Sequence, residues 1–519
     1  MFQFMKFIGK ISQIKMNTTS GFTFGKPESE GENSYRDGSQ SPFNDYLNVL
    51  PAINNGHFII VGRKGAGKSA IAKYIKDNAC EENGCYCEII KTDSIKLEQQ
   101  IQGENAESSE LATTFFHWLI LVKLVKLIIA SCHGEYTQEI KALRNFVRNN
   151  SGVVEVDKFS IKEISTLSNT NINVGALGNV GIFRAILERA LGKRFEKAPF
   201  YKILPALKEI VYKVLNFEDF KDLSFFVIFD DLDINFKADN LHDKLFIMNL
   251  IRIARDVNND LREANNTSVL IFLRDDIKKL LEGIVADTNK IFSTYSKELK
   301  WYDHNGYKNR ETDTILRQFI NKRIEQNFKR CKIAFLAADP WCSLFANNED
   351  CYGGKTAFKF ILDYTFYRPR DLILFCNNIG KNAYYFPIKG KIVKQLIHQY
   401  AIDNVREIKD ELAIYHCYSP DIVTKIFVVL KALTSYQYSG FSKETINAKL
   451  QEFGLTEEIL SMLIEYSLII PYDAQTGKYY IKYRETNIDD FVIEGNNIQY
   501  KLHNSIYAYF VPDSIKIAE

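Results

Sequence analysis

The feature that most restricts how this chain can fold is a glycine-rich octapeptide at positions 62–69, Gly-Arg-Lys-Gly-Ala-Gly-Lys-Ser. It fits the pattern G-x-x-x-x-G-K-[ST]. Residues 57–61 before it are apolar and β-rich, which predicts a buried strand, and residues 70–75 after it predict the start of a helix. A strand, a glycine-rich loop and a helix in this order form a phosphate-binding loop.

Each part of this octapeptide can contact a nucleotide. The glycines let the backbone curl so that N–H groups point at phosphate oxygens, and the helix adds its positive N-terminal end. We expect Lys68 to reach the β- and γ-phosphates and Ser69 to bind Mg²⁺. The alternative, a glycine turn before an ordinary helix, is disfavoured by the flanking segments. The predicted nucleotide-binding residues are Gly62, Arg63, Lys64, Gly65, Ala66, Gly67, Lys68 and Ser69.

A second apolar run, at residues 223–229, ends in the acidic sequence Asp230-Asp231-Leu232-Asp233. Acidic residues at the end of a buried strand are the usual second half of a nucleotide site. Asp230 is therefore predicted to hold Mg²⁺, directly or through water, and Asp231 to act as the general base for the attacking water. The alternative is a cap for the following helix, a role that Asp233 can also fill.

A further apolar run, at residues 268–273, ends in Arg274-Asp275-Asp276. An extra strand beyond the acidic one is expected of the ATPase division that includes AAA+ proteins, where the residue at its tip senses the γ-phosphate. Arg274 is the candidate for this catalytic role. A salt bridge between Arg274 and Asp275 or Asp276 explains the same residues equally well.

The rest of the chain divides by composition and periodicity. With 519 residues, two or three domains are expected. We predict a flexible lead-in at 1–44, a P-loop core at 45–310 with a helical insertion at about 94–221, a helical lid at 311–416, and a winged-helix-like module at 417–519. Further strands are predicted at 85–92 and 299–301, and helices of the insertion at 110–131, 136–149 and 182–217.

The lid contains Tyr367-Arg368-Pro369-Arg370-Asp371 at the start of a helix. In AAA+ proteins a small helical domain follows the core and places an arginine over the nucleotide. Arg368 and Arg370 are the candidates for this contact, with Pro369 fixing the chain direction. The alternative is a surface cap with solvated arginines.

The last hundred residues predict helices at 421–433, 442–453 and 456–467, then strands at 468–472 and 478–483 around a turn at 473–477. A second hairpin is predicted at 495–497. The third helix would be the DNA reader of a winged helix, but it carries Glu457, Glu458 and Glu465 and no basic residue. We therefore interpret the module as protein-interacting. Basic residues of the predicted wing, Lys478, Lys482 and Arg484, leave a weaker nucleic-acid contact open.

Three observations bear on location. Residues 111–130 are apolar, but His117, Lys123 and Lys126 lie within them, so a buried helix is favoured over a membrane span. The nine cysteines are irregularly spaced and match no zinc pattern. No signal peptide is recognised, and the net charge of +2 shows no general attraction to nucleic acid. We expect a cytoplasmic protein without a membrane contact.

Four segments together resemble a group of bacterial P-loop ATPases near the AAA+ and STAND proteins, with relatives in phage-defence gene clusters. They are the octapeptide at 62–69, Phe-Asp-Asp-Leu-Asp at 229–233, Phe-Leu-Arg-Asp-Asp at 272–276 and Arg-Pro-Arg-Asp at 368–371. The resemblance implies an α/β fold of the AAA+/ASCE type with a parallel sheet and an extra strand. It also implies ATP and Mg²⁺ as ligands, ATP hydrolysis, and self-assembly controlled by nucleotide.

Some features depart from that group. Asp231 stands where most AAA+ enzymes have glutamate, which favours slow hydrolysis and a switch over a motor. The sequence does not identify an arginine finger; Arg252 and Arg255, on the helix after the acidic strand, are candidates. The stretch between Lys68 and Asp230 is much longer than in a compact AAA+ core, so the insertion is predicted to be a specialised surface.

The favoured function is an oligomeric ATP-driven switch in bacterial anti-phage defence. The sequence contains no evident nuclease, protease, deaminase or NAD-cleaving constellation, so the switch is expected to control a separate effector protein. The alternative is a DNA-binding AAA+ ATPase of the replication-initiator or partition type. It shares the core and the winged helix, but the near-neutral charge and acidic third helix oppose it. A nucleotide-binding scaffold without turnover is a third hypothesis, and a small-molecule kinase is the least supported.

Overall fold

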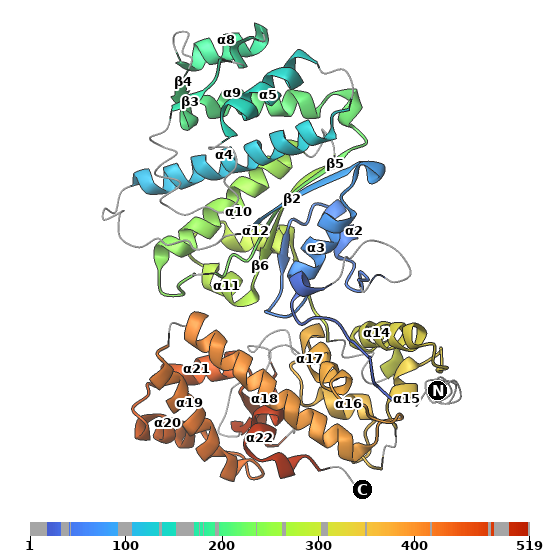
Figure 1. Cartoon of the computed structure of the whole chain (residues 1–519). Coiled ribbons are helices and arrows are strands. Elements are labelled where there is room, and N and C mark those ends of the chain that lie inside the picture. Colours follow the sequence, from blue (N-terminus) through green and yellow to red (C-terminus); the bar gives the residue numbers. More distant parts are fainter. Residues whose placement is uncertain are drawn as a thin grey trace, which may run out of the picture. The chain divides into compact units, whose positions relative to one another are not determined.

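The protein is described by a computed structural model that covers residues 18–32, 41, 43–91, 106–133, 137–151, 171–175, 177–179, 181–191, 197–234, 236–261, 266–302, 310–347, 350–415, 418–475, 479–481 and 498–516. The chain forms two compact units (Figure 1). One comprises residues 33–299 and is called here the α/β unit. The other combines residues 1–32 with residues 300–519 and is called the helical unit. Each is described by itself.

The α/β unit is built on a five-stranded sheet whose strands all run parallel. In chain order these are β1 (Ile59–Val61), β2 (Cys85–Lys91), β5 (Ser224–Asp230), β6 (Asn266–Leu273) and β7 (Ser296–Glu298). Their spatial order is β2-β5-β6-β1-β7, so β6 lies between the strand of the glycine loop and the acidic strand. Buried apolar side chains dominate β1, β5 and β6, as expected of a parallel sheet covered on both faces.

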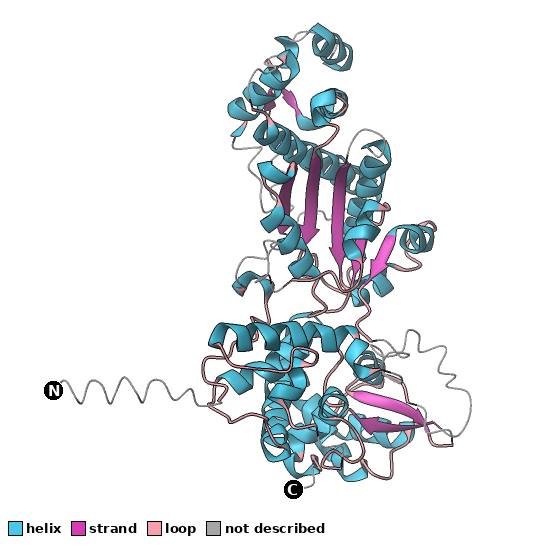
Figure 2. Cartoon of the chain, turned by 90° about the vertical axis from the view of Figure 1, so that its right-hand side faces the viewer, coloured by secondary structure: helices cyan, strands magenta, loops and turns pink. Residues whose placement is uncertain are grey.

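Helices cover both faces of this sheet. On one face α3 (Lys68–Asn78) packs against β2, β5 and β6, and on the other α4 (Ala106–Ser131) and α10 (Leu241–Leu261) pack against the strands and each other. Figure 1 shows the two layers, and Figure 2 shows the strands edge to edge between them. The remaining helices are α2 (Val49–Asn54), α11 (Asp275–Leu281) and α12 (Thr288–Tyr295). The result is a three-layer α/β/α arrangement.

The stretch predicted as an insertion, at about 94–221, includes α4, which packs on the sheet, and adds a further helical layer outside α4 (Figure 1). It contains α5 (Gln138–Asn149), α8 (Gly181–Leu191) and α9 (Phe200–Leu215), with a small antiparallel pair of β3 (Asn171–Asn173) and β4 (Lys197–Pro199). α4 is long and apolar enough to cross a membrane by length and composition, but most of that stretch is buried inside the unit. This burial is consistent with the core helix of a soluble protein.

Most of the predicted strands of the core are present, with one shift. The fifth strand is β7 at Ser296–Glu298, whereas the sequence predicted residues 299–301. Its pairing with β1 explains the shift, because Val61 lies opposite Glu298 and this register ends the strand before Leu299. Of the predicted 182–217 helix, the structure describes two separate helices, α8 and α9, with β4 preceding α9.

The helical unit begins with α14 (Ile315–Cys331), α15 (Pro340–Leu344), α16 (Ala357–Leu362), α17 (Pro369–Gly380) and α18 (Gly390–Tyr415). α14 packs against α15 and α17, and α17 packs against α18. Aromatic side chains fill much of the interior, including the stacked pair of Trp341 and Phe345. The predicted helical character of residues 311–416 is therefore present.

Residues 18–32 belong to this unit and differ from the flexible lead-in that the sequence predicts. Phe22 and Phe24 are fully buried, and Phe22 packs edge-on against Phe328 of α14. The side-chain amide of Asn327 accepts from the backbone N–H of Thr23 through its oxygen and donates to the Thr23 carbonyl oxygen through its nitrogen. Gly380, at the end of α17, makes room for the segment, since a Cβ there would lie 2.2 Å from the carbonyl oxygen of Phe22. Two buried phenylalanines thus hold an otherwise polar segment in place.

The last part of the unit has three helices followed by a strand pair, as the sequence predicts, but the strand that pairs with β8 along its length is at 498–502 rather than at the predicted 478–483. The helices are α19 (Pro420–Ala432), α20 (Lys443–Glu452) and α21 (Glu458–Glu465), and the strands are β8 (Ile469–Asp473) and β9 (Ile498–Leu502), before α22 (Asn504–Phe510). β8 and β9 are antiparallel. Tyr479 bridges to Tyr472, as expected for the first predicted hairpin. The second predicted hairpin, at 495–497, and the basic wing residues Lys478, Lys482 and Arg484 lie outside the described residues.

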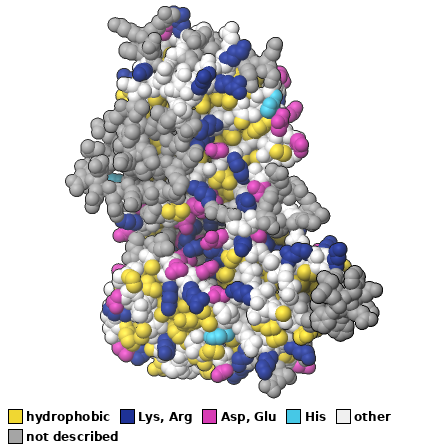
Figure 3. Space-filling model, viewed as in Figure 1, with side chains coloured by type: hydrophobic (Ala, Val, Ile, Leu, Met, Phe, Trp, Pro, Cys, Tyr) yellow, Lys and Arg dark blue, Asp and Glu magenta, His cyan; other side chains and the backbone are white. Residues whose placement is uncertain are grey.

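The surface agrees with the small net charge of the sequence. In the view of Figure 3, basic and acidic side chains both occur across the visible face, interspersed with apolar ones. The charge of +2 for the whole chain is the sum of 66 basic and 64 acidic residues. A nucleic-acid contact would therefore have to be local.

Candidate functional site

The glycine loop lies between β1 and α3, at the edge of the sheet where the parallel strands end. Gly65 and Gly67 have φ angles of +82° and +98°, a conformation that favours glycine. α3 begins at Lys68, immediately after Gly67. At Gly62 a Cβ would lie 3.1 Å from the Leu299 side chain and 3.2 Å from Ala66. The loop thus has the strand, turn and helix that the motif requires.

The Lys68 side chain folds back over this loop. Its ammonium donates to the carbonyl oxygens of Gly62 at 2.7 Å and Arg63 at 3.2 Å. Burial lowers the pKa of Lys68 below its ordinary value, with Arg274 acting in the same direction, whereas Asp233 and Asp230 oppose the shift. The ammonium is therefore a partly desolvated charge held by two neutral carbonyl groups, which an anion can replace at small cost.

Asp230, the last residue of β5, lies beside the start of α3. Its carboxylate is hydrogen-bonded to the side chain of Ser69. Burial raises the pKa of Asp230 to about 6, and the charge of Asp231 adds to the shift, while Ser69 and Lys68 oppose it. Only 3% of Asp230 is exposed. The structure therefore brings together the two predicted Mg²⁺ ligands, which come from distant parts of the sequence.

Asp231 turns away from the strand with a φ of +58°, which is unusual for an aspartate. Its carboxylate lies 3.4 Å from the ammonium of Lys91, the last residue of β2. Both side chains are partly exposed. The predicted general base is thus held at the strand edge by a cation that the sequence analysis did not single out.

Arg274, at the end of β6, is buried between two carboxylates. It donates to Asp276 through Nε at 3.0 Å and Nη2 at 2.6 Å, and to Asp233 through Nη1 at 3.1 Å. Of the two salt bridges considered from the sequence, the one with Asp276 is present. The contact with Asp233 joins the ends of β5 and β6. A role of Arg274 toward a γ-phosphate stays a prediction.

The other arginines singled out in the sequence also have partners. Arg252 and Arg255 both pair with Asp287, at 2.5 and 3.5 Å. In the helical unit, Arg368 is buried and bonds Asp371 at 2.6 Å, while Arg370 donates to the carbonyl oxygen of Pro27 at 3.2 Å. The predicted contact of Arg368 and Arg370 with a nucleotide stays a prediction.

The residues at the sheet edge include groups that could hold phosphates and Mg²⁺. Among the described residues, no group of three or more His, Cys, Asp or Glu side chains could hold a metal ion. Mg²⁺ commonly takes one or two protein oxygens and completes its shell with phosphate oxygens and water. Ser69 and Asp230 supply two such oxygens, and the glycine loop and Lys68 supply donors for phosphates.

Sequence reasoning missed Lys91 and the pairing role of Asp233. Lys91 lies directly opposite Asp230 in the β2–β5 register. A lysine at the end of the predicted 85–92 strand was a usable signal, because parallel strands in one sheet end at the same edge. No sequence pattern indicates the Asp233–Arg274 pair, because it depends on how the loops that follow β5 and β6 lie relative to each other.

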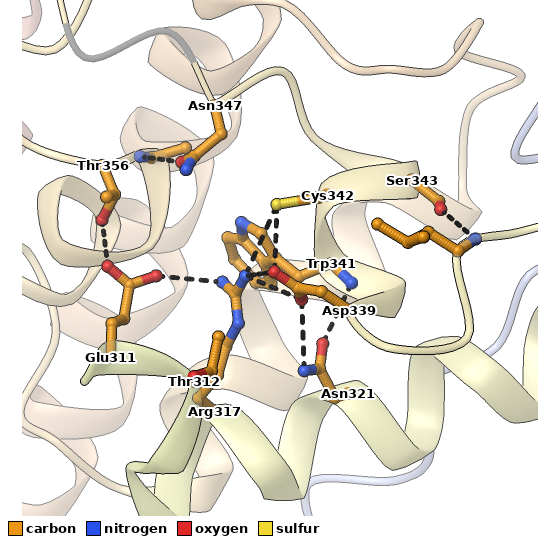
Figure 4. Close-up of polar contacts among 12 residues, drawn as sticks. Glu311, Thr312, Arg317, Asn321, Asp339, Trp341, Cys342, Ser343, Asn347 and Thr356 are labelled. Carbon is orange, nitrogen blue, oxygen red and sulfur yellow. Dashed lines mark hydrogen bonds and ion pairs between the residues drawn. The ribbon is translucent and has the colours of Figure 1, made fainter. Parts of the chain in front are cut away.

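A separate buried ion cluster lies in the helical unit (Figure 4). The Arg317 guanidinium lies against the rings of both Trp341 and Phe358, with its carbon 4.7 and 4.9 Å from the ring centroids. It donates to both oxygens of Asp339 at 2.9 Å and pairs with Glu311 at 3.4 Å. Burial opposes ionisation of Asp339, but Arg317 brings its pKa below the ordinary value.

The cluster connects three separate parts of the helical unit. Arg317 is on α14, Asp339 and Trp341 are at the start of α15, and Phe358 is on α16. Cys342 also donates to Asp339, and Asn321 bonds both Asp339 and the backbone of Trp341 (Figure 4). Because both acids form ion pairs with the buried arginine, we interpret this cluster as part of the domain core.

Comparison with known proteins covers this same region. A family model described as the FunZ-associated C-terminal helical domain matches residues 314–409. The match extends from the start of α14 into α18 and includes the Arg317 cluster. No curated protein and no solved structure shows significant similarity to the chain.

The raised pKa of Asp230 predicts how stability depends on pH. Because this group holds its proton more tightly when folded, its contribution is fully present below pH 4 and is lost as pH rises through about 6. Asp230→Asn should therefore be more stable than wild type at pH 7.5, with a flatter pH dependence between pH 4 and 6. Urea unfolding midpoints check this. An unchanged pH dependence, with lower stability at pH 7.5, would contradict it.

Arg317→Met should destabilise the helical unit, because it leaves Asp339 and Glu311 together without their shared cation. Loss of one partner from a buried ion pair costs about 3–5 kcal/mol. Thermal unfolding followed by circular dichroism measures the change. The matched control is Arg406→Met, since Arg406 is 72% exposed and pairs with Asp403 at the surface. Equal effects of the two substitutions would count against a central role for the cluster.

Proposed function

We propose that the α/β unit binds ATP with Mg²⁺ and hydrolyses it as a P-loop NTPase. The observation that carries this proposal is the hydrogen bond between Ser69, at the start of the helix after the glycine loop, and Asp230, at the end of another strand. These are the two residues expected to share one Mg²⁺. An ordinary glycine turn before a helix does not require a buried acidic residue from another strand beside the first turn of that helix.

The strand order supports the same proposal. β6 lies between β1, which carries the glycine loop, and β5, which carries the acids. This is the arrangement expected of the P-loop division with an additional strand, to which AAA+ proteins belong. In an open parallel sheet, ligands bind at the carboxyl ends of the strands. Lys68, Ser69, Asp230, Asp231 and Arg274 all lie at or beside such ends.

In this proposal each residue of the site has a separate role. The backbone N–H groups of the loop and the start of α3 bind phosphate oxygens, and Lys68 exchanges its carbonyl partners for the phosphates. Ser69 and Asp230 would hold Mg²⁺, which would neutralise phosphate charge. Asp231 accepts the proton of the attacking water. Lys91 competes with that task, because its ammonium pairs with the carboxylate that would accept the proton.

We further propose that turnover is slow and that the protein is a cytoplasmic, oligomeric switch acting on a separate effector. The Asp231–Lys91 pair supports slow turnover, since the base must leave this ion pair before it accepts a proton. The FunZ-associated helical domain supports a defence-associated context. A DNA-reading AAA+ initiator remains less supported, because α21 presents exposed Glu457 and Glu458 where a recognition helix needs positive charge.

Lys68→Ala should abolish binding of a fluorescent ATP analogue, because the substitution removes the cation that contacts the phosphates. Asp231→Asn should retain binding and lose turnover by at least about 100-fold, the contribution typical of a general base. Equilibrium titration and phosphate release measure the two effects. Mass photometry with and without ATP tests the assembly. Equal nucleotide binding by wild type and Lys68→Ala would overturn the proposal.

Lys91→Met should raise ATP turnover by about threefold or more, because the Asp231 carboxylate no longer has to break an ion pair with Lys91 before it accepts a proton from water. Steady-state phosphate release measures the change. Lys73→Met is the matched control, since Lys73 forms a comparable ion pair with Asp77 on α3, at 3.2 Å. Lower turnover at unchanged ATP affinity would instead assign Lys91 a direct part in the reaction.

A further inference from the structure

The outer face of the β8–β9 sheet carries aromatic and basic side chains. Ile469, Tyr500 and Leu502 point inward and join the core formed with α19, α20 and α21. Because side chains alternate along a strand, Tyr472, on β8, and Lys501, on β9, point to the opposite face. Figure 2 shows this short sheet as the strand pair of the helical unit.

On this face, Tyr472 and Lys501 form a compact group. The Tyr472 hydroxyl donates to the side-chain oxygen of Gln499 at 2.5 Å. The ammonium of Lys501 lies 4.3 Å from the centroid of the Tyr472 ring. The group therefore places a positive charge beside an aromatic ring.

A turn that follows α19 continues this surface. Gly440 lies against the group, since a Cβ there would be 2.2 Å from the Tyr472 hydroxyl. Tyr438, two residues earlier, is 69% exposed, and Tyr436 is 40% exposed. Lys516 lies over the Tyr438 ring, with its ammonium 5.3 Å from the centroid. A second tyrosine–lysine pair thus adjoins the first through the turn.

The exposed tyrosines are concentrated in this part of the chain. The described residues include only five tyrosines among the large apolar side chains that are strongly exposed, and three of them belong to the last module: Tyr436, Tyr438 and Tyr479. Tyr479 bridges to Tyr472 through the backbone and so borders the same strand. Concentration of exposed rings marks an interaction surface, whereas single exposed apolar residues are ordinary.

The charges on this surface are available for an anion. Among the described residues, neither Lys501 nor Lys516 forms an ion pair with a carboxylate. Lys449, near Tyr436, is in contrast neutralised by Glu452 at 2.6 Å. On α21 the exposed Glu457 and Glu458 give the opposite sign. A polyanion would therefore be repelled by the helix and attracted by the sheet face.

We propose that the face formed by Tyr436, Tyr438, Tyr472, Lys501 and Lys516, called here the tyrosine–lysine face, binds single-stranded nucleic acid. Each ammonium lies over one face of a ring, so a phosphate bound by the lysine brings the neighbouring base within reach of the same tyrosine. Unpaired bases stack on exposed aromatic rings with little sequence preference. A duplex hides its base faces, so single strands are the class that this surface fits.

Fluorescence anisotropy of a labelled oligothymidylate tests this proposal with the full-length protein and no ATP. Because this binding does not require nucleotide turnover, its failure is distinguishable from failure of the ATPase proposal. Tyr438→Ala should weaken binding about tenfold, and Tyr438→Phe should retain it, because stacking needs the ring. Lys501→Glu with Lys516→Glu should weaken binding further and reduce its dependence on salt, by about 0.7 in log–log slope for each phosphate that is no longer neutralised.

Two control variants match these changes elsewhere. Tyr385→Ala removes a tyrosine that is 67% exposed, and Lys141→Glu reverses an exposed charge on α5 of the other unit. Both should bind like wild type. The proposal is overturned if wild type binds no single strand, if the face variants bind as the controls do, or if duplex DNA binds equally well. The proposal would also be overturned if wild type bound a protein partner but no nucleic acid, and Tyr438→Ala abolished binding of that partner.

Discussion

The common edge at which the parallel strands end is the constraint on which the proposed chemistry depends. Hydrogen bonding between β5, β6 and β1 fixes where Asp230, Arg274 and the glycine loop lie relative to one another. Ser69 then needs only the first turn of α3 to reach Asp230. The geometry of the site is precise because rigid strands hold its residues. The glycine loop is anchored between one of these strands and α3, so its hydrogen-bond donors are also held in place.

The structure handles buried charge in the same way in both units. Arg274, Arg317 and Arg368 are each nearly inaccessible to water, and each has a carboxylate within hydrogen-bonding distance. Arg317 and Arg368 also lie against aromatic rings, which lowers the cost of removing water from the guanidinium. Lys68 differs, since the hydrogen bonds described for its ammonium are to carbonyl groups. That difference separates a structural cation from one suited to a ligand.

Local patterns in the sequence predicted much of this fold, and long-range partners explain what they missed. The glycine loop and the apolar runs before Asp230 and Arg274 could be recognised because each is continuous in the chain. The partner of Asp231 could not be chosen without the register that places Lys91 at the same edge. Phe22 and Phe24 were overlooked because their neighbours are polar, and their binding surface lies on α14 and α17, late in the sequence. The site assignments themselves remain predictions until nucleotide binding is measured.

The attachment of residues 18–32 has a consequence for how the chain is made. Arg323 bonds the backbone of Phe24 across a separation of 299 residues, and the whole α/β unit lies between them in the chain. During synthesis, the first segment of the helical unit emerges long before its partners on α14. The α/β unit can fold in that interval, whereas the helical unit must wait for its second part. Until then Phe22 and Phe24 are exposed apolar groups that a chaperone could bind. The order of folding is thus set by how one unit interrupts the other.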